Sequence, residues 1–264
     1  MKISTIVMLL VAALASPLSH AADMSAAQIM ARNFLAAKVS ALKADATMLL
    51  ESRGGASRER RMTMLTRLQD NGVDANVLIR FLSPGDIRGT AFLQLEHSSA
   101  DDDIWVYLPA LKKSRRLVAN NKKDSFFGSD FSYGDILPPR VDLYRHVLGD
   151  SETLDGHETY VIMSTPASDS VLRDSGYSRK RTWVRKDSFL EAKVEYYDTD
   201  GRLLKTQTAT DQKLIDPDQG RWIAQRREMV NHQSGHRTVL TLSRIVNGPA
   251  VGATDFSVRA IERE

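Results

Sequence analysis

The sequence predicts a mainly β protein built on one large antiparallel sheet. Along residues 190–197, apolar side chains alternate strictly with Glu and Lys, which is typical of a strand with one face in solvent. Turn sequences, such as the Asp-Thr-Asp-Gly run at residues 198–201, separate strand-like runs at short intervals. Because no Pro-rich or Ser-rich linker divides the series, we expect one domain.

The first 21 residues have the features of a secretory signal peptide. Lys2 supplies a positive charge, residues 6–15 are apolar, and residues 19–21 (Ser-His-Ala) form a small-x-small cleavage site. This apolar run is too short to cross a bilayer, which takes about 20 residues. We therefore expect residues 1–21 to be removed and residues 22–264 to be exported as a soluble domain; an uncleaved anchor is the alternative. The chain has no cysteine, so we expect neither disulfides nor a thiol that carries a lipid anchor.

The expected elements follow in chain order. Residues 25–28 (Ser-Ala-Ala-Gln) have the form of a capping box, and the apolar residues after them predict an amphipathic helix at 26–41. Beyond this helix the pattern changes to a period of two. We expect strands near residues 45–52, 58–69, 73–82, 91–97, 103–108, 115–119, 160–165, 179–185, 190–197, 203–211, 222–230 and 237–246.

An antiparallel sheet of this size should curl rather than lie flat. Its outward side chains are expected to be the charged ones, and its inward face needs a cover. The helix at 26–41 and an irregular region near 126–148 are the only covers that the sequence indicates. Because both are small, we expect an apolar concavity that binds apolar ligands; a tightly packed barrel is the alternative.

The charge balance argues against a nucleic-acid partner. Removal of the signal peptide takes away one of the 36 basic residues and none of the 33 acidic ones, which leaves the domain nearly neutral. A nucleic-acid-binding domain carries a larger basic excess or a clustered stripe. The dense basic runs at 58–61, 112–116 and 179–181 are interpreted as solvated strand edges and hairpin ends.

Residues 125–136 (SFFGSDFSYGDI) place four aromatic residues among Gly, Ser and Asp. This mixture suits neither a helix nor a regular strand and predicts an ordered loop that packs its rings. The candidate ligand-binding residues are Trp105, Phe126, Phe127, Phe131 and Tyr133. The four rings of the loop either line the mouth of the concavity or plug the end of the sheet, and both arrangements bury them to a similar extent.

The sequence indicates binding rather than catalysis. It contains no recognisable nucleophile–base pair, no hydrolase elbow around Ser129 and no phosphate-binding glycine loop. His232 and His236 are four residues apart, but Asn231 and Gly235 place them in a hairpin loop rather than on one helix face. We therefore expect no catalytic residue, no metal site and no cofactor.

Three motifs occur in order over residues 82–136. They are LSPGDIRGTAFL at 82–93, WVYLPALKKSRRL at 105–117, and the aromatic run at 125–136. Together they resemble the outer-membrane lipoprotein-sorting-like proteins of the LolA/LolB-like superfamily, in the branch found with resistance-nodulation-division (RND) permeases of the MmpL type. The resemblance implies a half-open antiparallel β-barrel of about 11 strands, with helices plugging its mouth and a hydrophobic cavity inside.

The resemblance also implies a function. In that superfamily the cavity carries acyl chains of lipoproteins or lipids across the periplasm, so we expect a periplasmic carrier that touches membranes transiently, delivers toward the outer membrane and has an RND-type permease as partner. The alternative is a non-catalytic accessory subunit of such a permease, or another envelope interaction protein, whose cavity is filled by its own side chains.

Arg88, in the turn at 86–90, is the candidate gate residue. In this hypothesis its guanidinium donates hydrogen bonds to carbonyls of the helical lid and releases them when the ligand arrives. The alternative is an ordinary surface turn, in which an ion pair contributes little.

Overall fold

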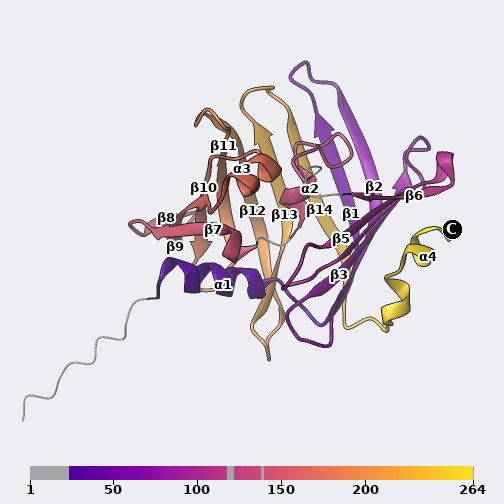
Figure 1. Cartoon of the computed structure of the whole chain (residues 1–264), viewed down its shortest axis with the longest axis horizontal. Helices are drawn as coiled ribbons and strands as arrows, with labels where there is room; N and C mark the ends of the chain where they lie inside the picture. Colours follow the sequence, from indigo (N-terminus) through magenta and orange to yellow (C-terminus); the bar gives the residue numbers. More distant parts are fainter. Residues whose placement is uncertain (1–23, 118–121, 138–139, 264) are drawn as a thin grey trace, which may run out of the picture.

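The computed structural model describes residues 24–117, 122–137 and 140–263. Fourteen antiparallel strands of these residues form one sheet (Figure 1). They are β1 (Ala41–Glu51), β2 (Ser57–Leu68), β3 (Ala75–Ser83), β4 (Ala91–Leu95), β5 (Asp103–Leu108), β6 (Lys113–Leu117), β7 (Tyr144–Leu148), β8 (Glu152–Leu154), β9 (His157–Pro166), β10 (Arg179–Arg185), β11 (Glu191–Tyr197), β12 (Leu203–Asp216), β13 (Arg221–Asn231) and β14 (Arg237–Asn247). The mainly β class is confirmed, with more strands than expected. The predicted signal peptide at 1–21 lies outside the described residues.

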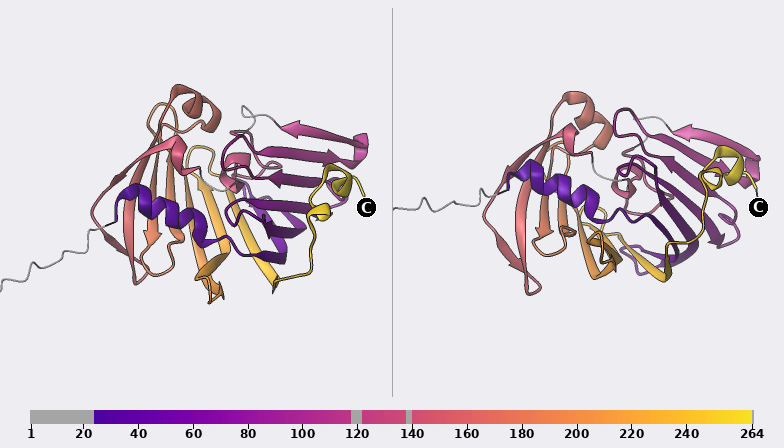
Figure 2. Two further views of the ribbon diagram at one scale, coloured as in Figure 1. Left: turned by 60° about the horizontal axis from the view of Figure 1, so that its bottom comes forward. Right: turned by 90° about the horizontal axis from the view of Figure 1, so that it is seen from below.

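The strand order brings the first and last strands together at the centre of the sheet. It runs β6-β5-β4-β3-β2-β1-β14-β13-β12-β11-β10-β9-β7, with β8 paired to β9. Each half is a series of neighbouring strands, and β1 pairs with β14 from Leu42–Asn247 to Glu51–Arg237. The sheet curls but does not close; β6 forms one edge, and β7 together with β8 forms the other (Figure 2).

Helix α1 (Ala26–Ala36) crosses the concave side of the sheet and contacts β7 and β13 (Figure 2). Its predicted capping box is confirmed, because the Gln28 N–H donates to Ser25 Oγ and the Ser25 N–H donates to Gln28 Oε1. The helix ends at Ala36 rather than at the predicted residue 41, since Ala41 already pairs with Arg67 as the first residue of β1. None of the helices in the described part of the chain has the length and apolar character needed to cross a bilayer.

The region near 126–148 is more regular than expected. It contains the short helix α2 (Tyr133–Ile136) and the edge strand β7, which pairs with β9. Val147 and Leu148 of β7 are 64% and 40% exposed. An exposed edge strand has no buried face that imposes a period of two, which explains why the sequence did not indicate β7. A further helix, α3 (Asp169–Ser175), connects β9 to β10.

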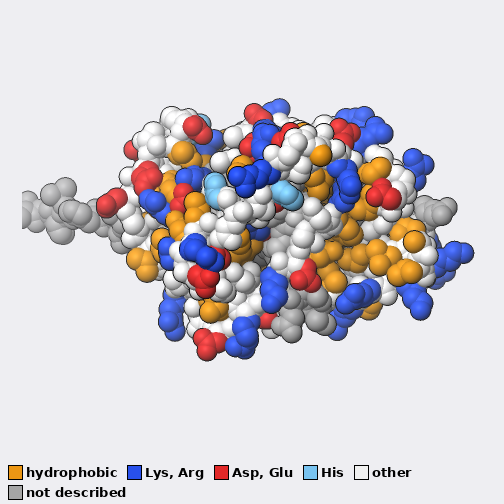
Figure 3. Space-filling view, turned by 90° about the horizontal axis from the view of Figure 1, so that it is seen from above, with side chains coloured by type: hydrophobic (Ala, Val, Ile, Leu, Met, Phe, Trp, Pro, Cys, Tyr) orange, Lys and Arg blue, Asp and Glu red, His pale blue; other side chains and the backbone are white. Residues whose placement is uncertain are grey.

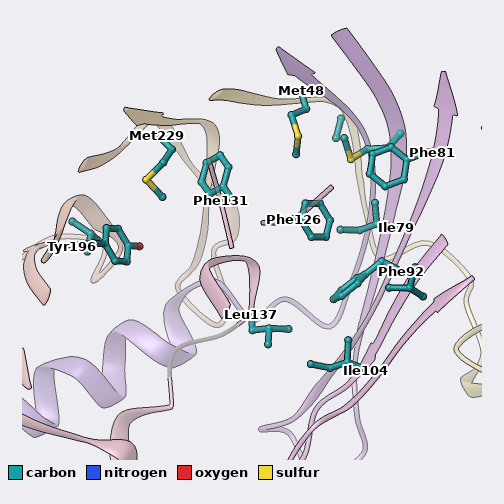
Figure 4. Packing of buried hydrophobic residues seen from close by; sticks show 14 of the residues in the cluster. Met48, Ile79, Phe81, Phe92, Ile104, Phe126, Phe131, Leu137, Tyr196 and Met229 are labelled. Carbon is teal, nitrogen blue, oxygen red and sulfur yellow. The ribbon is translucent and has the colours of Figure 1, made fainter. Parts of the chain in front are cut away.

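Apolar clusters cover both faces of the sheet. On the concave face, side chains of β1–β5, β11 and β13 surround Phe126 and Phe131 (Figure 4). On the opposite face, the C-terminal segment with α4 (Val258–Ile261) packs Phe256 and Ile261 against Ala91 and Leu93 of β4. This third cover was not predicted, and it corrects the expectation that the outward side chains are the charged ones.

Candidate functional site

An apolar cavity of ≈ 220 Å³ lies on the concave side, over the centre of the sheet. Strands β1, β2, β3, β13 and β14 form its walls, with side chains such as Met48, Met62 and Ile79. The aromatic segment, defined here as residues 125–137, contributes Phe126 and Phe131. Because side chains alternate along a strand, apolar residues two positions apart, such as Ala46 and Met48 on β1 or Met62 and Met64 on β2, line this one space.

A second cavity of ≈ 230 Å³ continues the first toward α1. The two share the lining residues Ala37, Val39, Thr66, Val77, Ile136 and Arg227, so we treat them as one cleft. The α1 end of the cleft also has charged walls, formed by Lys38, Asp135, Lys180 and Glu191. The cleft thus has an apolar end and a polar end, as sites for amphiphilic ligands do.

The charges at the polar end are largely paired among themselves. Arg227 Nη1 lies 3.2 Å from Glu191 Oε1, and Lys205 Nζ lies 2.6 Å from Asp135 Oδ2. Lys180 lies over the rings of Tyr144, Tyr177 and Tyr196. Charges paired in this way compensate one another when they are desolvated, so a ligand does not need to supply a counter-charge for them.

The aromatic segment is a compact loop that forms part of the cavity wall. The Phe126 N–H donates to the Phe131 carbonyl at 2.7 Å, and Ser129 Oγ donates to the Phe126 carbonyl at 2.7 Å. Phe126 and Phe131 are each 1% exposed and line the cavity (Figure 4). Phe127 and Tyr133 are half-buried and pack against the same cluster. The structure therefore brings four of the five candidate aromatic residues together.

Two carboxylates tie the aromatic segment to the sheet. Thr238 Oγ1, on β14, donates to Asp130 Oδ2 at 2.7 Å. Asp135 accepts hydrogen bonds from Lys205 Nζ, on β12, at 2.6 Å and from the Tyr177 hydroxyl at 3.0 Å. Burial raises the pKa of Asp135, but the charge of Lys205 and the hydrogen bonds to the carboxylate outweigh burial and hold the pKa below its ordinary value. Both carboxylates therefore have structural partners.

The fifth candidate, Trp105, lies on the other face of the sheet. Along β5, Ile104 and Val106 join the concave cluster, while Trp105 and Tyr107 pack in the cluster that the C-terminal segment covers. This separation is a direct consequence of side-chain alternation. Trp105 is therefore not part of the cleft, which corrects its assignment to the cavity mouth.

The contact that the gate hypothesis assigned to Arg88 is made by a different arginine. Arg88 is exposed, and its Nε donates to the Leu82 carbonyl at 3.1 Å within its own turn. Arg221, on β13, donates from Nη1 to the Leu35 carbonyl at 2.8 Å, in the last turn of α1. No sequence pattern indicates that residues 35 and 221 meet, so Arg221 was missed.

Further polar contacts hold α1 and the residues after it over the cleft. Asn33 Nδ2 donates to the Phe189 carbonyl at 2.9 Å. Lys38 Nζ lies 2.6 Å from Glu96 Oε2, with side chains only 5% and 2% exposed, and also donates to the Val73 carbonyl. These contacts connect the cover to both halves of the sheet.

The three basic runs differ in their surroundings. The run at 112–116 lies along the free edge strand β6, in agreement with its interpretation. The run at 179–181 belongs to β10, which pairs with both β9 and β11, so it is not a strand edge. In the run at 58–61, Arg60 is only 8% exposed, which corrects its interpretation as solvated. The sequence did contain a signal for the burial of Arg60, because Arg60, Met62 and Met64 are two residues apart and therefore share one face of β2.

The histidine pair lies in the β13–β14 hairpin, as expected, and His232 Nε2 lies 2.8 Å from Thr206 Oγ1. Within the residues that the structure describes, no three His, Cys, Asp or Glu side chains are arranged to hold a metal ion. What the cleft offers a ligand is apolar surface, an aromatic wall and charged groups at its margins.

Comparison with solved structures defines the class as the LolA-like fold. A putative outer membrane lipoprotein-sorting protein domain from Vibrio parahaemolyticus is 31% identical, with a TM-score of 0.81 over 90% of this chain and 98% of that one. A DUF1329 family protein from Desulfovibrio piger is 30% identical, with a TM-score of 0.81 over 89% and 97%. A LolA superfamily protein from Nitrosomonas europaea, 22% identical with a TM-score of 0.68 over 89% and 99%, has the same fold.

The family follows from these matches. A family model described as "uncharacterized protein" matches residues 73–263, and no curated protein matches the chain. With about a third of its residues identical to those of the Vibrio and Desulfovibrio proteins over nearly their whole length, the chain belongs to the outer-membrane lipoprotein-sorting-like family of the LolA-like superfamily.

Proposed function

We propose that this protein is a non-catalytic periplasmic carrier that holds acyl chains of lipids or lipoproteins in the cleft and delivers them toward the outer membrane. The observation that supports this function most directly is the apolar cavity of ≈ 220 Å³ on the concave side. Its walls of Met, Ile and Phe side chains suit a hydrocarbon chain. The fold that the chain shares with a lipoprotein-sorting protein domain supports the same function.

Acyl-chain burial supplies the affinity that a carrier needs. Each buried CH₂ contributes about 0.8 kcal/mol, so about twelve methylenes contribute about 10 kcal/mol before ordering costs. A carrier must also release its cargo, and opening the cover offsets part of this gain. The cover consists of α1 and the aromatic segment, which are held by polar contacts such as Arg221–Leu35 and Asp130–Thr238.

A cavity-filling variant separates ligand binding from folding. Ala46 lines the cavity and is 3% exposed, whereas Thr47 points to the opposite face of β1. We expect Ala46→Met to weaken the binding of a fluorescent fatty acid and of a palmitoylated peptide by about tenfold or more, equivalent to about 1.4 kcal/mol. The matched control Thr47→Met should bind both probes as the wild type does. Delipidated wild-type protein that takes up neither probe from labelled vesicles would contradict the carrier function.

One observation favours the second candidate, an accessory subunit of an RND-type permease or another envelope interaction protein. The free edge strand β7 exposes Val147 and Leu148, and such edges accept strands of other proteins. Mass spectrometry of organic extracts from the purified protein distinguishes the two. Co-purifying lipid supports the carrier, and a lipid-free extract supports the subunit.

A further inference from the structure

Arg60 is a buried cation, and two of its three guanidinium nitrogens lack a partner in the part of the chain that the structure describes. It lies on β2, is 8% exposed, and its Nε and Nη1 atoms have no hydrogen-bond partner among the described residues. No carboxylate of these residues lies within ion-pair distance of its guanidinium. An unpaired buried charge is strongly unfavourable, which distinguishes Arg60 from the paired charges at the polar end of the cleft.

The surroundings of Arg60 increase its need for an anion. Burial lowers its pKa, the neighbouring charge of Arg58 lowers it further, and Asp86 only partly opposes them. Arg58 is exposed at the same end of the sheet. Seen from above, this end of the molecule displays both basic and acidic side chains around apolar areas (Figure 3).

Arg60 is next to two residues that line the apolar cavity. It pairs across the β1–β2 ladder with Met48, and Met62 is the next residue on the same face of β2; both methionines line the cavity. Gly128 of the aromatic segment lies next to the guanidinium, because a side-chain Cβ at this position would be 3.8 Å from Arg60 Nη2. In Figure 4, Met48 points from β1 toward Phe126 and Phe131, the two rings of that segment that line the cavity.

We propose that Arg60 binds the anionic head group, a carboxylate or a phosphate monoester, of an amphiphile whose acyl chain occupies the cavity. The guanidinium fork matches the paired oxygens of either group, and its unpartnered N–H groups would become donors in charge-assisted hydrogen bonds. This inference rests on the proposed carrier function and specifies its ligand. Neutral acyl esters and amides would fill the same cavity but would leave Arg60 unpaired.

The test compares head groups at constant chain length. The probes are dodecanoate, dodecyl phosphate, methyl dodecanoate and inorganic phosphate, and binding is measured by displacement of a neutral fluorescent dye and, for inorganic phosphate, by calorimetry. We expect the wild type to bind the two anionic amphiphiles about tenfold or more tighter than the methyl ester, since charge-assisted hydrogen bonds are stronger than those to a neutral ester. Arg60→Met should lose this preference while still binding the methyl ester.

Two control variants locate the effect. Arg61→Met makes the same charge change on the exposed face of β2 and should keep the preference. Lys180→Met removes a cation at the polar end of the cleft, and it should also keep the preference. If Arg60→Met does not fold, Arg60→Lys, which keeps the charge but not the fork, should still show a preference reduced from that of the wild type.

The outcomes separate this inference from the carrier function. Equal wild-type affinity for dodecanoate and its methyl ester would overturn the inference and leave the carrier function in place. Loss of the preference in Lys180→Met, with the preference retained in Arg60→Met, would overturn it by moving the head group to the polar end. Inorganic phosphate that binds as tightly as dodecyl phosphate would overturn the link to an amphiphile. Failure of every amphiphile to bind the wild type would overturn the carrier function itself.

Discussion

Lys205 Nζ lies 2.6 Å from Asp135 Oδ2, and the two side chains are only 6% and 0% exposed. This ion pair joins β12 to the aromatic segment, which is far from it in the sequence. The Tyr177 hydroxyl donates to the same carboxylate at 3.0 Å. The wall of the cavity is thus positioned by a buried polar network rather than by ring packing alone.

Breaking this pair should destabilise the fold. Asp135→Asn leaves the Lys205 ammonium buried without a counter-charge, and we expect the free energy of unfolding in urea to fall by about 3–5 kcal/mol. The control is Asp200→Asn, which breaks the exposed Arg202–Asp200 pair and should cost about 1 kcal/mol or less. Similar losses in the two variants would show that the buried network contributes little.

The same pair predicts a pH dependence. Because the pKa of Asp135 is lower in the folded protein than in the unfolded chain, its contribution is complete above the unfolded value of about 3.9 and is lost as the pH falls through the folded value. We therefore expect the difference in unfolding free energy between wild type and Asp135→Asn to become smaller as urea unfolding is repeated from about pH 6 down to about pH 2. A difference that widens toward low pH would contradict the lowered pKa.

Arg221 should control the opening of α1. Arg221→Met removes the donor to the Leu35 carbonyl, a charge-assisted bond worth about 1.5–3 kcal/mol, and we expect amide hydrogen exchange in α1 to become about tenfold faster or more. Arg88→Met should leave exchange in α1 unchanged, because Arg88 bonds within its own turn. The reverse pattern would return the gate role to Arg88.

Neighbouring rings of the aromatic segment should differ in their contribution to stability. Phe126 is 1% exposed, so Phe126→Ala should lower the free energy of unfolding by about 3–5 kcal/mol. Phe127 is half-buried and has less apolar area to lose, so Phe127→Ala should cost clearly less. Chemical denaturation of both variants provides the measurement. An equal loss would mean that Phe127 plugs the sheet as firmly as Phe126 does.

The hairpins were predictable because their signals are local. In β11, Val194 and Tyr196 are buried between more exposed neighbours, which is the alternation that the sequence displays. The turn after β11 has Gly201 at φ +80°, a conformation that favours glycine. Strand β7 shows no such alternation. It lies at the edge of the sheet with exposed residues, so it has no buried face that would require apolar side chains at every second position.

The candidate site was predictable only in part. The four rings of the aromatic segment lie within eight residues of one another, so their clustering could be inferred from composition. The sequence did not identify Arg60, Lys205 and Arg221. Each of them lies next to residues that are far from it in the sequence. An inward-phase Arg or Lys on an amphipathic strand marks a buried charge, but its partner cannot be read from the same strand.

Local pattern was enough to establish the β class, the alternation along each strand, most hairpins and the N-terminal capping box, because these depend on residues a few positions apart. Long-range contacts settled the rest: the pairing of β1 with β14, the side of the sheet on which Trp105 lies, the C-terminal cover and the pairing of the buried charges. The physical reason is that burial and electrostatic energies depend on which distant surfaces meet. The alternation of residue types along a strand shows which side chains share a face. It does not show which of the two faces becomes the concave one.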